Sequence, residues 1–285
     1  MTIAISIKVN DGVVLAADSA GSLIAQVNNT PTVVQVYNNA NKILNLRKGL
    51  PVGAMFWGAG SIGKASISTL LKDLRVRFTG PDPEHADWHL DPQAYTIEHV
   101  AQKVREFLVD EHYTPAFATW PQKPLMGVII GGYSAGSAMA DEYKIEIDQA
   151  GVCTGPVLVR ANGDCGSFWA GEPEAITRLL QGYSVGLPSL LDTQLGLADG
   201  TVAAALAQLQ PQLAAQVIND AMPIKDAIDV AEFLVELTSK SSRYTPGAAT
   251  VGGPVEIAAI TKHEGFKWVK RKYYFTQDLN PEFSP

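Results

Sequence analysis

A pair of short apolar segments joined by a two-residue turn constrains the fold of this chain more than any other feature. Residues 3–9 (IAISIKV) and 13–17 (VVLAA) flank Asp11-Gly12. Asp-Gly between two apolar runs is a strong signal for a β-hairpin. We therefore expect an antiparallel sheet whose first strand begins at residue 3. Chain ends are usually frayed, so a core strand this close to residue 1 indicates that the end itself has a function.

The rest of the sequence alternates between groups of strands and groups of helices. Apolar runs bounded by turn residues predict strands at 32–36, 42–46, 52–57, 125–131, 139–147, 157–160, 255–261 and 266–269. Helical spacing of apolar residues predicts helices at 67–78, 96–110, 173–181 and 225–239, with further helical turns in 182–222. This order favours an α+β protein in which two antiparallel sheets lie between layers of helices. No internal repeat or clear linker divides the chain, so we expect a single domain over residues 1–285.

The chain is acidic, with a formal net charge of −7, and it has no block of basic residues. Such a chain is a poor candidate for binding nucleic acid or an anionic membrane surface. It has neither an apolar run of about 18 residues nor a secretory leader pattern, so we expect a cytoplasmic protein with no membrane span. In that reducing compartment, Cys153 and Cys165 are expected to be free thiols.

His85, Asp87 and His89 are the candidates for metal ligands, and they lie in a polar, proline-rich loop at 80–94. No further ligand accompanies them, so a solvated loop is favoured over a metal site. We expect neither a metal nor a cofactor.

Residues 58–63 form a literal G-x-G-x-x-G between an apolar strand and a helix, which is the context of a dinucleotide-binding turn. No second strand ending in an acidic residue follows about 20 residues later, as that motif requires. The same residues nearly match a phosphate-binding loop through Lys64, but Ala65 replaces the Ser or Thr that holds magnesium. A tight strand-to-helix turn with exposed backbone N–H groups is the favoured interpretation.

Thr2 gives the N-terminal strand its expected function. Methionine before a small residue is readily removed, and removal of Met1 leaves Thr2 with a free α-amine beside its hydroxyl. The amine has an ordinary pKa of about 7.7–8.0, so it is a suitable base for that hydroxyl near neutral pH. Nucleophile and base then belong to one residue.

Three further residues fit the needs of such a site. A nearby cation lowers the pKa of the amine, and Lys42 at the start of a predicted strand is the candidate. Asp18 ends the strand paired with the first strand, so its carboxylate is placed to hold that cation. Gly58 lies in the glycine turn, where backbone N–H groups are available for a tetrahedral oxyanion.

These residues resemble a proteasome β-subunit of the N-terminal-nucleophile hydrolase superfamily, in the style of the divergent bacterial homologues HslV and the ancestral β-subunit, Anbu. The resemblance covers most of the chain. The matching segments are residues 1–22 with Thr2 and Asp18, NKI at 41–43, WGAGS at 57–61, GGYSAGSAMADEYKIEIDQAG at 131–151 and VGGPVEIAAITKHEG at 251–265. Extra length falls at 23–37, 80–94 and 182–222, and an irregular tail at 278–285.

The resemblance implies a four-layer αββα sandwich and a threonine endopeptidase with Thr2 as nucleophile, assisted by Asp18 and Lys42. It implies that the backbone of Ser22 pairs with a bound peptide, and that Phe56 and Gly60 shape the substrate pocket. It also implies a homo-oligomeric ring or spiral that encloses the sites, with an ATP-dependent unfoldase as a possible partner.

Two departures from the family pattern concern the residues that support the nucleophile. Glu172 occupies the position of a family serine, and we expect it to stand in by hydrogen bonding to the amine of Thr2. The family's Asp-x-x-Ser falls on Ala248 and Val251. Two alternatives therefore stay open, namely a non-peptidase amide hydrolase of the same superfamily and an inert assembly subunit.

Two groups of residues outside this site have ordinary structural interpretations. A basic patch near the end is typical of a protected edge strand and consists of Lys267, Lys270, Arg271 and Lys272. An apolar stripe with helical spacing fits core packing or a subunit interface and consists of Leu206, Leu209, Leu213 and Val217.

Overall fold

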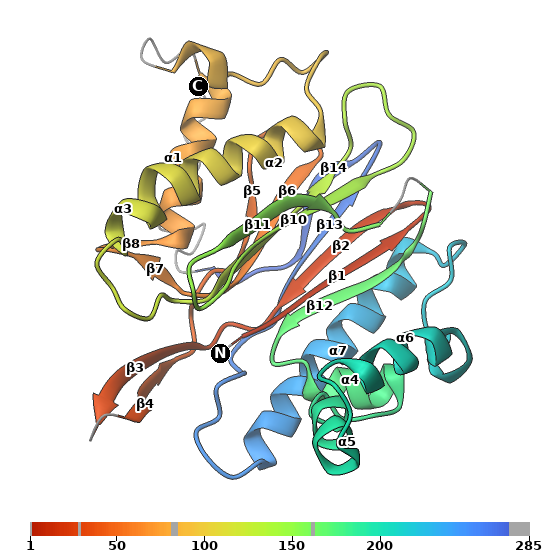
Figure 1. Ribbon diagram of the computed structural model, residues 1–285. Coiled ribbons are helices and arrows are strands. Elements are labelled where there is room, and N and C mark those ends of the chain that lie inside the picture. The colour runs from red at the N-terminus through yellow and green to blue at the C-terminus, as the bar shows by residue number, and fades with distance from the viewer. Residues whose placement is uncertain (1, 28–29, 81–84, 161–162, 274–285) are drawn as a thin grey trace.

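The structure is a computed structural model that describes residues 2–27, 30–80, 85–160 and 163–273 (Figure 1). Met1 and the tail at 278–285 lie outside the described residues. The fold is α+β, with two antiparallel five-stranded sheets and several helices, as expected for a sandwich.

The first sheet contains the N-terminal hairpin at its centre. Its strands follow one another in space in the order β12 (Gly166–Gly171), β1 (Ile3–Val9), β2 (Gly12–Ala17), β13 (Glu256–Thr261) and β14 (Gly265–Lys270). All neighbours are antiparallel, and the β1–β2 register places Ala4 opposite Ala17. The start and end of the chain therefore meet in one sheet.

The second sheet is built from the middle of the chain. Its order is β11 (Cys153–Leu158), β10 (Asp141–Ile147), β9 (Met126–Gly132), β6 (Val52–Gly58) and β5 (Ile43–Asn45), again with antiparallel neighbours. Two small hairpins stand apart from both sheets. They are β3 (Gly21–Val27) with β4 (Thr30–Tyr37), which extends away from the body in Figure 1, and β7 (Ser61–Ile62) with β8 (Ala65–Ser66).

The helices lie on the outer sides of the two sheets (Figure 1). On the side of the second sheet are α1 (Ile67–Thr79), the 3₁₀ turn Ala86–Trp88, α2 (Ile97–Arg105), the π-helical segment Glu106–Tyr113 and α3 (Thr114–Ala116). On the side of the first sheet are α4 (Glu174–Gln181), α5 (Leu187–Leu195), α6 (Thr201–Leu213) and α7 (Ile224–Tyr244). Ser66 and Thr96 cap α1 and α2 by accepting backbone N–H bonds, which fixes where these helices begin.

Successive side chains of β1 point alternately to the two faces of the first sheet, and both faces make apolar contacts. Ile3, Ile5 and Ile7 pack against α4 and α7, whereas Ala4 belongs to a separate cluster that joins the two sheets. A third apolar cluster lies between the second sheet and helices α1 and α2. Since successive strand residues point to opposite faces, a continuously apolar strand such as β1 is expected only where both faces are covered.

The structure corrects several of the expected boundaries. The predicted strand at 157–160 begins earlier, as β11 at Cys153–Leu158. Strand β12 and strand β3 were not predicted, although β12 is the direct partner of β1. The expected insertion at 23–37 forms most of the β3–β4 hairpin.

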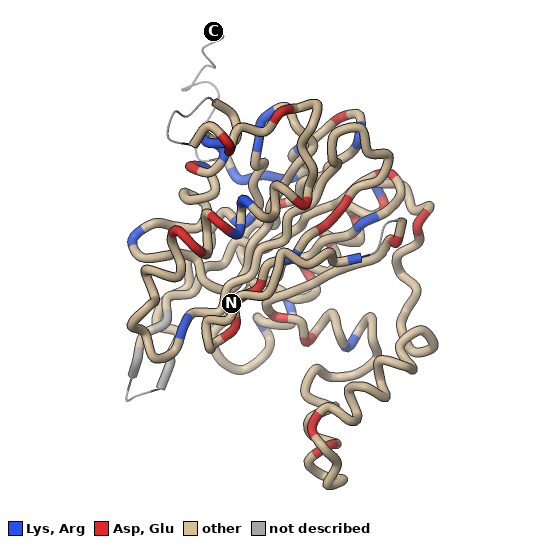
Figure 2. The backbone as a smooth tube through the Cα atoms, turned by 45° about the horizontal axis from the view of Figure 1, so that its top comes forward, with Lys and Arg blue, Asp and Glu red and all other residues tan. Residues whose placement is uncertain are grey.

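The helical insertion at 182–222 forms α5 and α6, which are poorly buried. In α6, Leu209 and Leu213 are exposed and no residue is buried, so this part of the apolar stripe does not pack in the core, whereas Val217 packs against the cluster beneath α7. Residues 182–222 contain no Lys or Arg, and the corresponding lobe has no blue segment in Figure 2. Within the described ranges, no helix is both long and apolar enough to cross a bilayer.

Candidate active site

Thr2 is held by the backbone of the residue that directly follows β12. Its carbonyl oxygen accepts the backbone N–H of Glu172 at 2.8 Å, and the residue is 4% exposed. Gly171 has φ +102°, and a Cβ atom at this position would lie 1.9 Å from the carbonyl oxygen of Thr2. Only glycine fits there, so the β1–β12 pairing fixes the backbone of Thr2.

Asp18 lies directly after β2 and is completely buried. One of its carboxylate oxygens, Oδ1, accepts the backbone N–H of Ile3 at 3.0 Å. The other, Oδ2, accepts the backbone N–H groups of Ala20 and Gly252, each at 3.0 Å. The carboxylate is therefore fixed against the residue that follows Thr2, as the hairpin register predicts.

Lys42 lies directly before β5, and its ammonium donates to Asp18 Oδ1 at 2.6 Å. Both side chains of this ion pair are almost fully buried. The backbone carbonyl of Lys42 accepts the N–H of Phe56 at 3.1 Å, so strand β6 holds Lys42 in place. The ammonium and the N–H of Ile3 contact the same carboxylate oxygen, and the predicted pair of Asp18 and Lys42 is brought together.

Burial lowers the pKa of the Lys42 amine below its ordinary value of 10.5, because the charged form has lost its water. The carboxylate of Asp18 opposes this change by attraction and hydrogen bonding. The ammonium of Lys272 lowers the pKa of Lys42 further, and Glu256 opposes it. A lysine with a lowered pKa gives up its proton more easily than a lysine in water.

Sequence reasoning missed Lys272 and Glu256 as members of this site. Lys272 donates to the hydroxyl of Ser19 at 2.6 Å and forms an ion pair with Glu256 at 3.3 Å, and both charged side chains are buried. Burial also lowers the pKa of Lys272. The basic patch that includes Lys272 predicts a protected edge strand, and β14, which precedes Lys272, is an edge strand. The sequence feature that could have indicated this part of the site is Glu256, a charged residue in the predicted apolar strand at 255–261.

Gly58 ends β6 with φ +82°, and a Cβ atom there would lie 2.3 Å from the carbonyl oxygen of Leu125. The turn therefore requires glycine at this position. Gly60 is exposed, and a Cβ atom at Gly60 would meet no other atom within 4 Å. Of the two predicted glycines, only Gly58 is fixed by close packing.

The other predicted residues lie in different surroundings. Ser22 belongs to β3, where it pairs with Val36 of the projecting hairpin. Phe56 is buried in the cluster between the second sheet and helices α1 and α2. Glu172 reaches Thr2 through its backbone N–H, and Glu172 lines a cavity of about 490 Å³ that Ala248 also lines. Val251 is buried in the cluster beneath α7.

The glycine turn does not have the surroundings of a dinucleotide-binding motif. Strand β6, which precedes it, is antiparallel to both β5 and β9. The turn continues into the small β7–β8 hairpin before α1 begins. In the proline-rich loop, Asp87 forms an ion pair with Lys103 at 2.9 Å, and the ring of His85 packs against Trp88. Among the described residues, no group of three His, Cys, Asp or Glu side chains is placed to hold a metal ion.

No protein-family model and no curated protein matches the sequence. Among solved structures, the chain is similar to Anbu, the ancestral β-subunit, from Yersinia bercovieri, with 11% identity and a TM-score of 0.45 over 95% of this chain and 88% of that chain. It is also similar to Anbu from Hyphomicrobium sp. strain MC1, with 15% identity and a TM-score of 0.49 over 95% of this chain and 86% of that chain. Values this low describe a distant likeness in shape and carry no inference about activity.

Proposed function

We propose that this chain is an N-terminal-nucleophile hydrolase that cleaves peptide bonds, with Thr2 as the nucleophile once the residue before it is removed. One observation carries the proposal. The ammonium of Lys42 and the backbone N–H of Ile3 contact the same oxygen of Asp18. A buried charged pair therefore lies one peptide unit from a threonine that is fixed by β12.

The proposed reaction has two stages. The hydroxyl oxygen of Thr2 attacks the carbonyl carbon of the peptide, and its proton passes to the α-amine of the same residue. The C–N bond then breaks, the proton goes to the leaving amine, and an ester remains on Thr2. A water molecule gives its proton to the α-amine and attacks the ester, which releases the acid and regenerates the hydroxyl.

The charged cluster supports the first stage electrostatically. The positive charges of Lys42 and Lys272 favour the neutral form of a nearby amine, which is the form that accepts a proton. The backbone N–H of Gly58 is the proposed donor to the oxyanion. Ser22 is the proposed partner of the peptide backbone, Phe56 and Gly60 the pocket residues, and Glu172 the residue that stands in for the family serine.

The finer structural proposals follow from the same assignment. We propose a four-layer αββα sandwich over a single domain, a homo-oligomeric ring or spiral, and a cytoplasmic location with an ATP-dependent unfoldase as a partner. The exposed leucines of α5 and α6 favour contact with other molecules, because a monomer seldom exposes several large apolar side chains together.

The test needs a chain whose first residue is Thr2. A cleavable N-terminal fusion that ends directly before Thr2 supplies it, and the same chain with a non-cleavable extension is the matched control. Both are treated with a peptide α′,β′-epoxyketone, which forms a ring with a hydroxyl and an amine on one residue. We expect labelling of Thr2 in the free chain alone, detected by intact mass and peptide mapping.

Substitutions at Thr2 separate the proposed chemistry from folding. Thr2→Ser is expected to keep labelling and peptidase activity, whereas Thr2→Val, which keeps the shape, loses at least about 10³-fold in rate. Equal labelling with and without the extension would overturn the proposal. A parallel panel of peptides and small amides distinguishes a peptidase from an amide hydrolase, and no turnover of either by the free chain indicates the inert subunit.

A further inference from the structure

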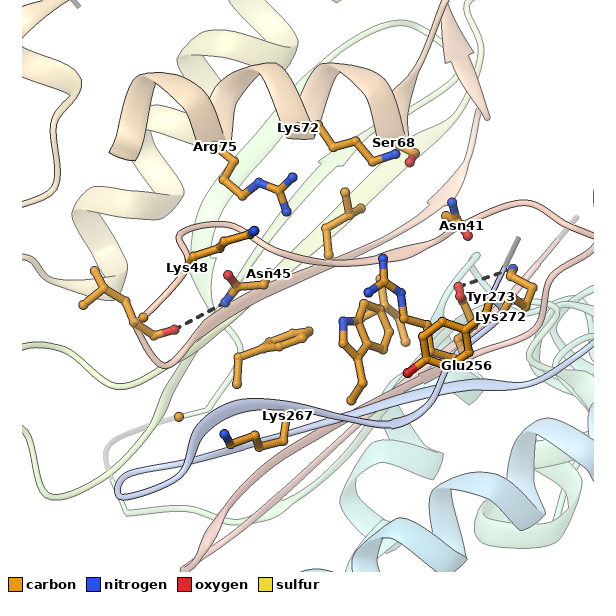
Figure 3. A pocket seen from close by; sticks show the side chains of 18 of the residues that line it. Asn41, Asn45, Lys48, Ser68, Lys72, Arg75, Glu256, Lys267, Lys272 and Tyr273 are labelled. Atoms are coloured by element: carbon orange, nitrogen blue, oxygen red, sulfur yellow. Dashed lines mark hydrogen bonds and ion pairs between the residues drawn. The ribbon is translucent and has the colours of Figure 1, made fainter. Parts of the chain in front are cut away.

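A cavity of about 660 Å³ borders the site described above through Glu256 and Lys272, and it extends from there along helix α1. Its walls are helix α1, the segment around β5 and the end of β14, which are the places where the edge strands of the two sheets meet (Figure 3). Ligand pockets commonly have volumes of about 300–1,000 Å³. The cavity is therefore large enough for a small organic molecule.

Basic side chains enter this cavity from three elements that are distant in sequence. Lys72 and Arg75 extend into it from α1 and Lys48 from the turn after β5, as Figure 3 shows. Arg271, which follows β14, lies over the ring of Trp268 at 4.9 Å and lines the same cavity. None of these four cations forms an ion pair with any residue that the structure describes.

Helix geometry explains why α1 presents its charges here. Ser68, Lys72 and Arg75 are spaced four and three residues apart, so they lie on one face of the helix. Leu71, Leu74 and Phe78 occupy the buried face of α1 and belong to the apolar cluster between this helix and the second sheet. The polar face is thereby directed to the cavity.

The acidic side chains that line the cavity are already engaged. Glu256 forms the buried ion pair with Lys272, and Glu264 accepts the hydroxyl of Thr261. With Lys267, five basic side chains that line the cavity form no ion pair with a described residue, and Glu264 is the one acidic lining side chain without such a pair, in a chain whose formal net charge is −7. Like charges that are brought together destabilise a folded chain unless an anion compensates them. Repulsion between these cations is unfavourable by itself, and a bound anion would convert it into attraction.

We propose that this cavity binds a small polyphosphate, either free or as part of a nucleotide. Arg75 and Arg271 supply forked N–H donors that suit phosphate oxygens, and Lys48 and Lys72 supply point charges. The exposed ring of Tyr273 and the ring of Trp268 also line the cavity and provide flat apolar surface for a base. The site is separate from the glycine turn, and it does not depend on the proposed role of Thr2.

The experiment is calorimetric titration of the full chain with inorganic tripolyphosphate and, separately, with ATP, both without magnesium. We expect saturable binding that weakens as salt is raised, because the contacts are electrostatic. The double variant Lys72→Gln/Arg75→Gln is expected to bind at least tenfold more weakly, since it removes two of the charged hydrogen-bond donors. Equal affinities assign recognition to the phosphates, and tighter binding of ATP assigns a nucleotide.

Lys64→Gln is the matched control, because Lys64 is an exposed lysine beside the glycine turn and outside the cavity. Its affinity for both ligands is expected to equal that of the unmodified chain. Loss of binding in Lys64→Gln with retention in the double variant would move the ligand to the glycine turn and overturn the proposal. Failure of both ligands to bind, or equal binding by all variants, also overturns it. Thermal unfolding without ligand verifies that each variant is folded.

Discussion

At the scale of single residues, Asp18 organises the candidate site. Its two carboxylate oxygens accept three backbone N–H groups and the ammonium of Lys42. A buried charge that is satisfied from all sides keeps its geometry, and this fixed carboxylate holds Lys42 beside the start of β1.

The lowered pKa of Lys42 predicts a specific dependence of stability on pH. Between that lowered pKa and the ordinary value of 10.5, the unfolded chain binds more protons than the folded chain, so raising the pH through this interval stabilises the folded chain. The contribution grows by up to about 1.4 kcal/mol per pH unit. The variant Lys42→Met lacks this titration. The difference in free energy of unfolding between the unmodified chain and this variant is therefore expected to change in favour of the unmodified chain.

Denaturant unfolding at a series of alkaline pH values measures this difference. Lys240→Met is the control, because the side chain of Lys240 is exposed and, among the residues that the structure describes, it forms an ion pair only with Glu236 on the same helix. Its stability difference is expected to stay constant over the same pH range. A constant difference for Lys42→Met as well would contradict a lowered pKa at Lys42.

At the scale of secondary-structure elements, the glycine turn after β6 contains a position at which two backbone segments lie so close together that only glycine fits. Gly58 has a positive φ, and its α-carbon lies against the carbonyl of Leu125, which precedes β9. Gly60, two residues later, has open space around it. The G-x-G-x-x-G pattern alone does not distinguish these two positions.

Gly58→Ala and Gly60→Ala form a matched pair that tests this difference. Gly58→Ala is expected to destabilise the chain by roughly 1–3 kcal/mol or more, because the backbone strain adds to the clash with Leu125. Gly60→Ala is expected to change the free energy of unfolding by less than about 0.5 kcal/mol. Thermal or denaturant unfolding measures both, and equal losses would contradict the close packing at Gly58.

The periodicity of apolar residues predicted the strands and helices that have regular apolar spacing. It did not predict the strands whose sequences lack such spacing. Strand β1 and helix α1 have the expected extents to within one residue. Strand β12 (GSFWAG) is short and begins and ends in glycine, so its sequence does not indicate a strand without its partner β1. Strand β3 is paired only with β4 and has no core face to impose alternation.

The same limit applies to the site. Asp18 was predictable because the register of the β1–β2 hairpin places the end of β2 near the start of β1. Lys42 precedes a strand of the other sheet, and it was predicted as a cation at a strand start and by the family resemblance of NKI. Lys272 lies far along the chain, and only the antiparallel pairing of β2, β13 and β14 brings it to the site. The charge of a residue and its distance along the sequence do not predict contacts that form only when distant strands pair.

At the scale of the whole molecule, a buried polar group joins the two sheets. Glu142 on β10 accepts the hydroxyl of Ser6 on β1 and forms an ion pair with Arg160. Glu142 and Ser6 are fully buried, and the side chain of Arg160 is mostly so. Removing one partner of a buried pair leaves an uncompensated charge, which is strongly destabilising.

Glu142→Ala is accordingly expected to lower the free energy of unfolding by about 3–5 kcal/mol. Glu146→Ala is the control on the same strand, because its ion pair with Lys144 is partly exposed and is expected to contribute less than about 1 kcal/mol. Chemical denaturation compares the two variants. Similar losses in both would show that the inter-sheet group contributes no more than a surface pair.

The hydrogen bond from Gly252 to Asp18 and the position of Lys272 have a consequence for the order of events during synthesis. Thr2 lies near the start of the given sequence, whereas Gly252, Glu256 and Lys272 lie near its end, so a ribosome makes them much later than Thr2. A growing polypeptide that stops short of Gly252 contains Thr2 but lacks one of the two N–H groups that bind Asp18 Oδ2, and it lacks the ammonium of Lys272. The charged surroundings of Thr2 are therefore complete only after nearly all of this sequence has been synthesised.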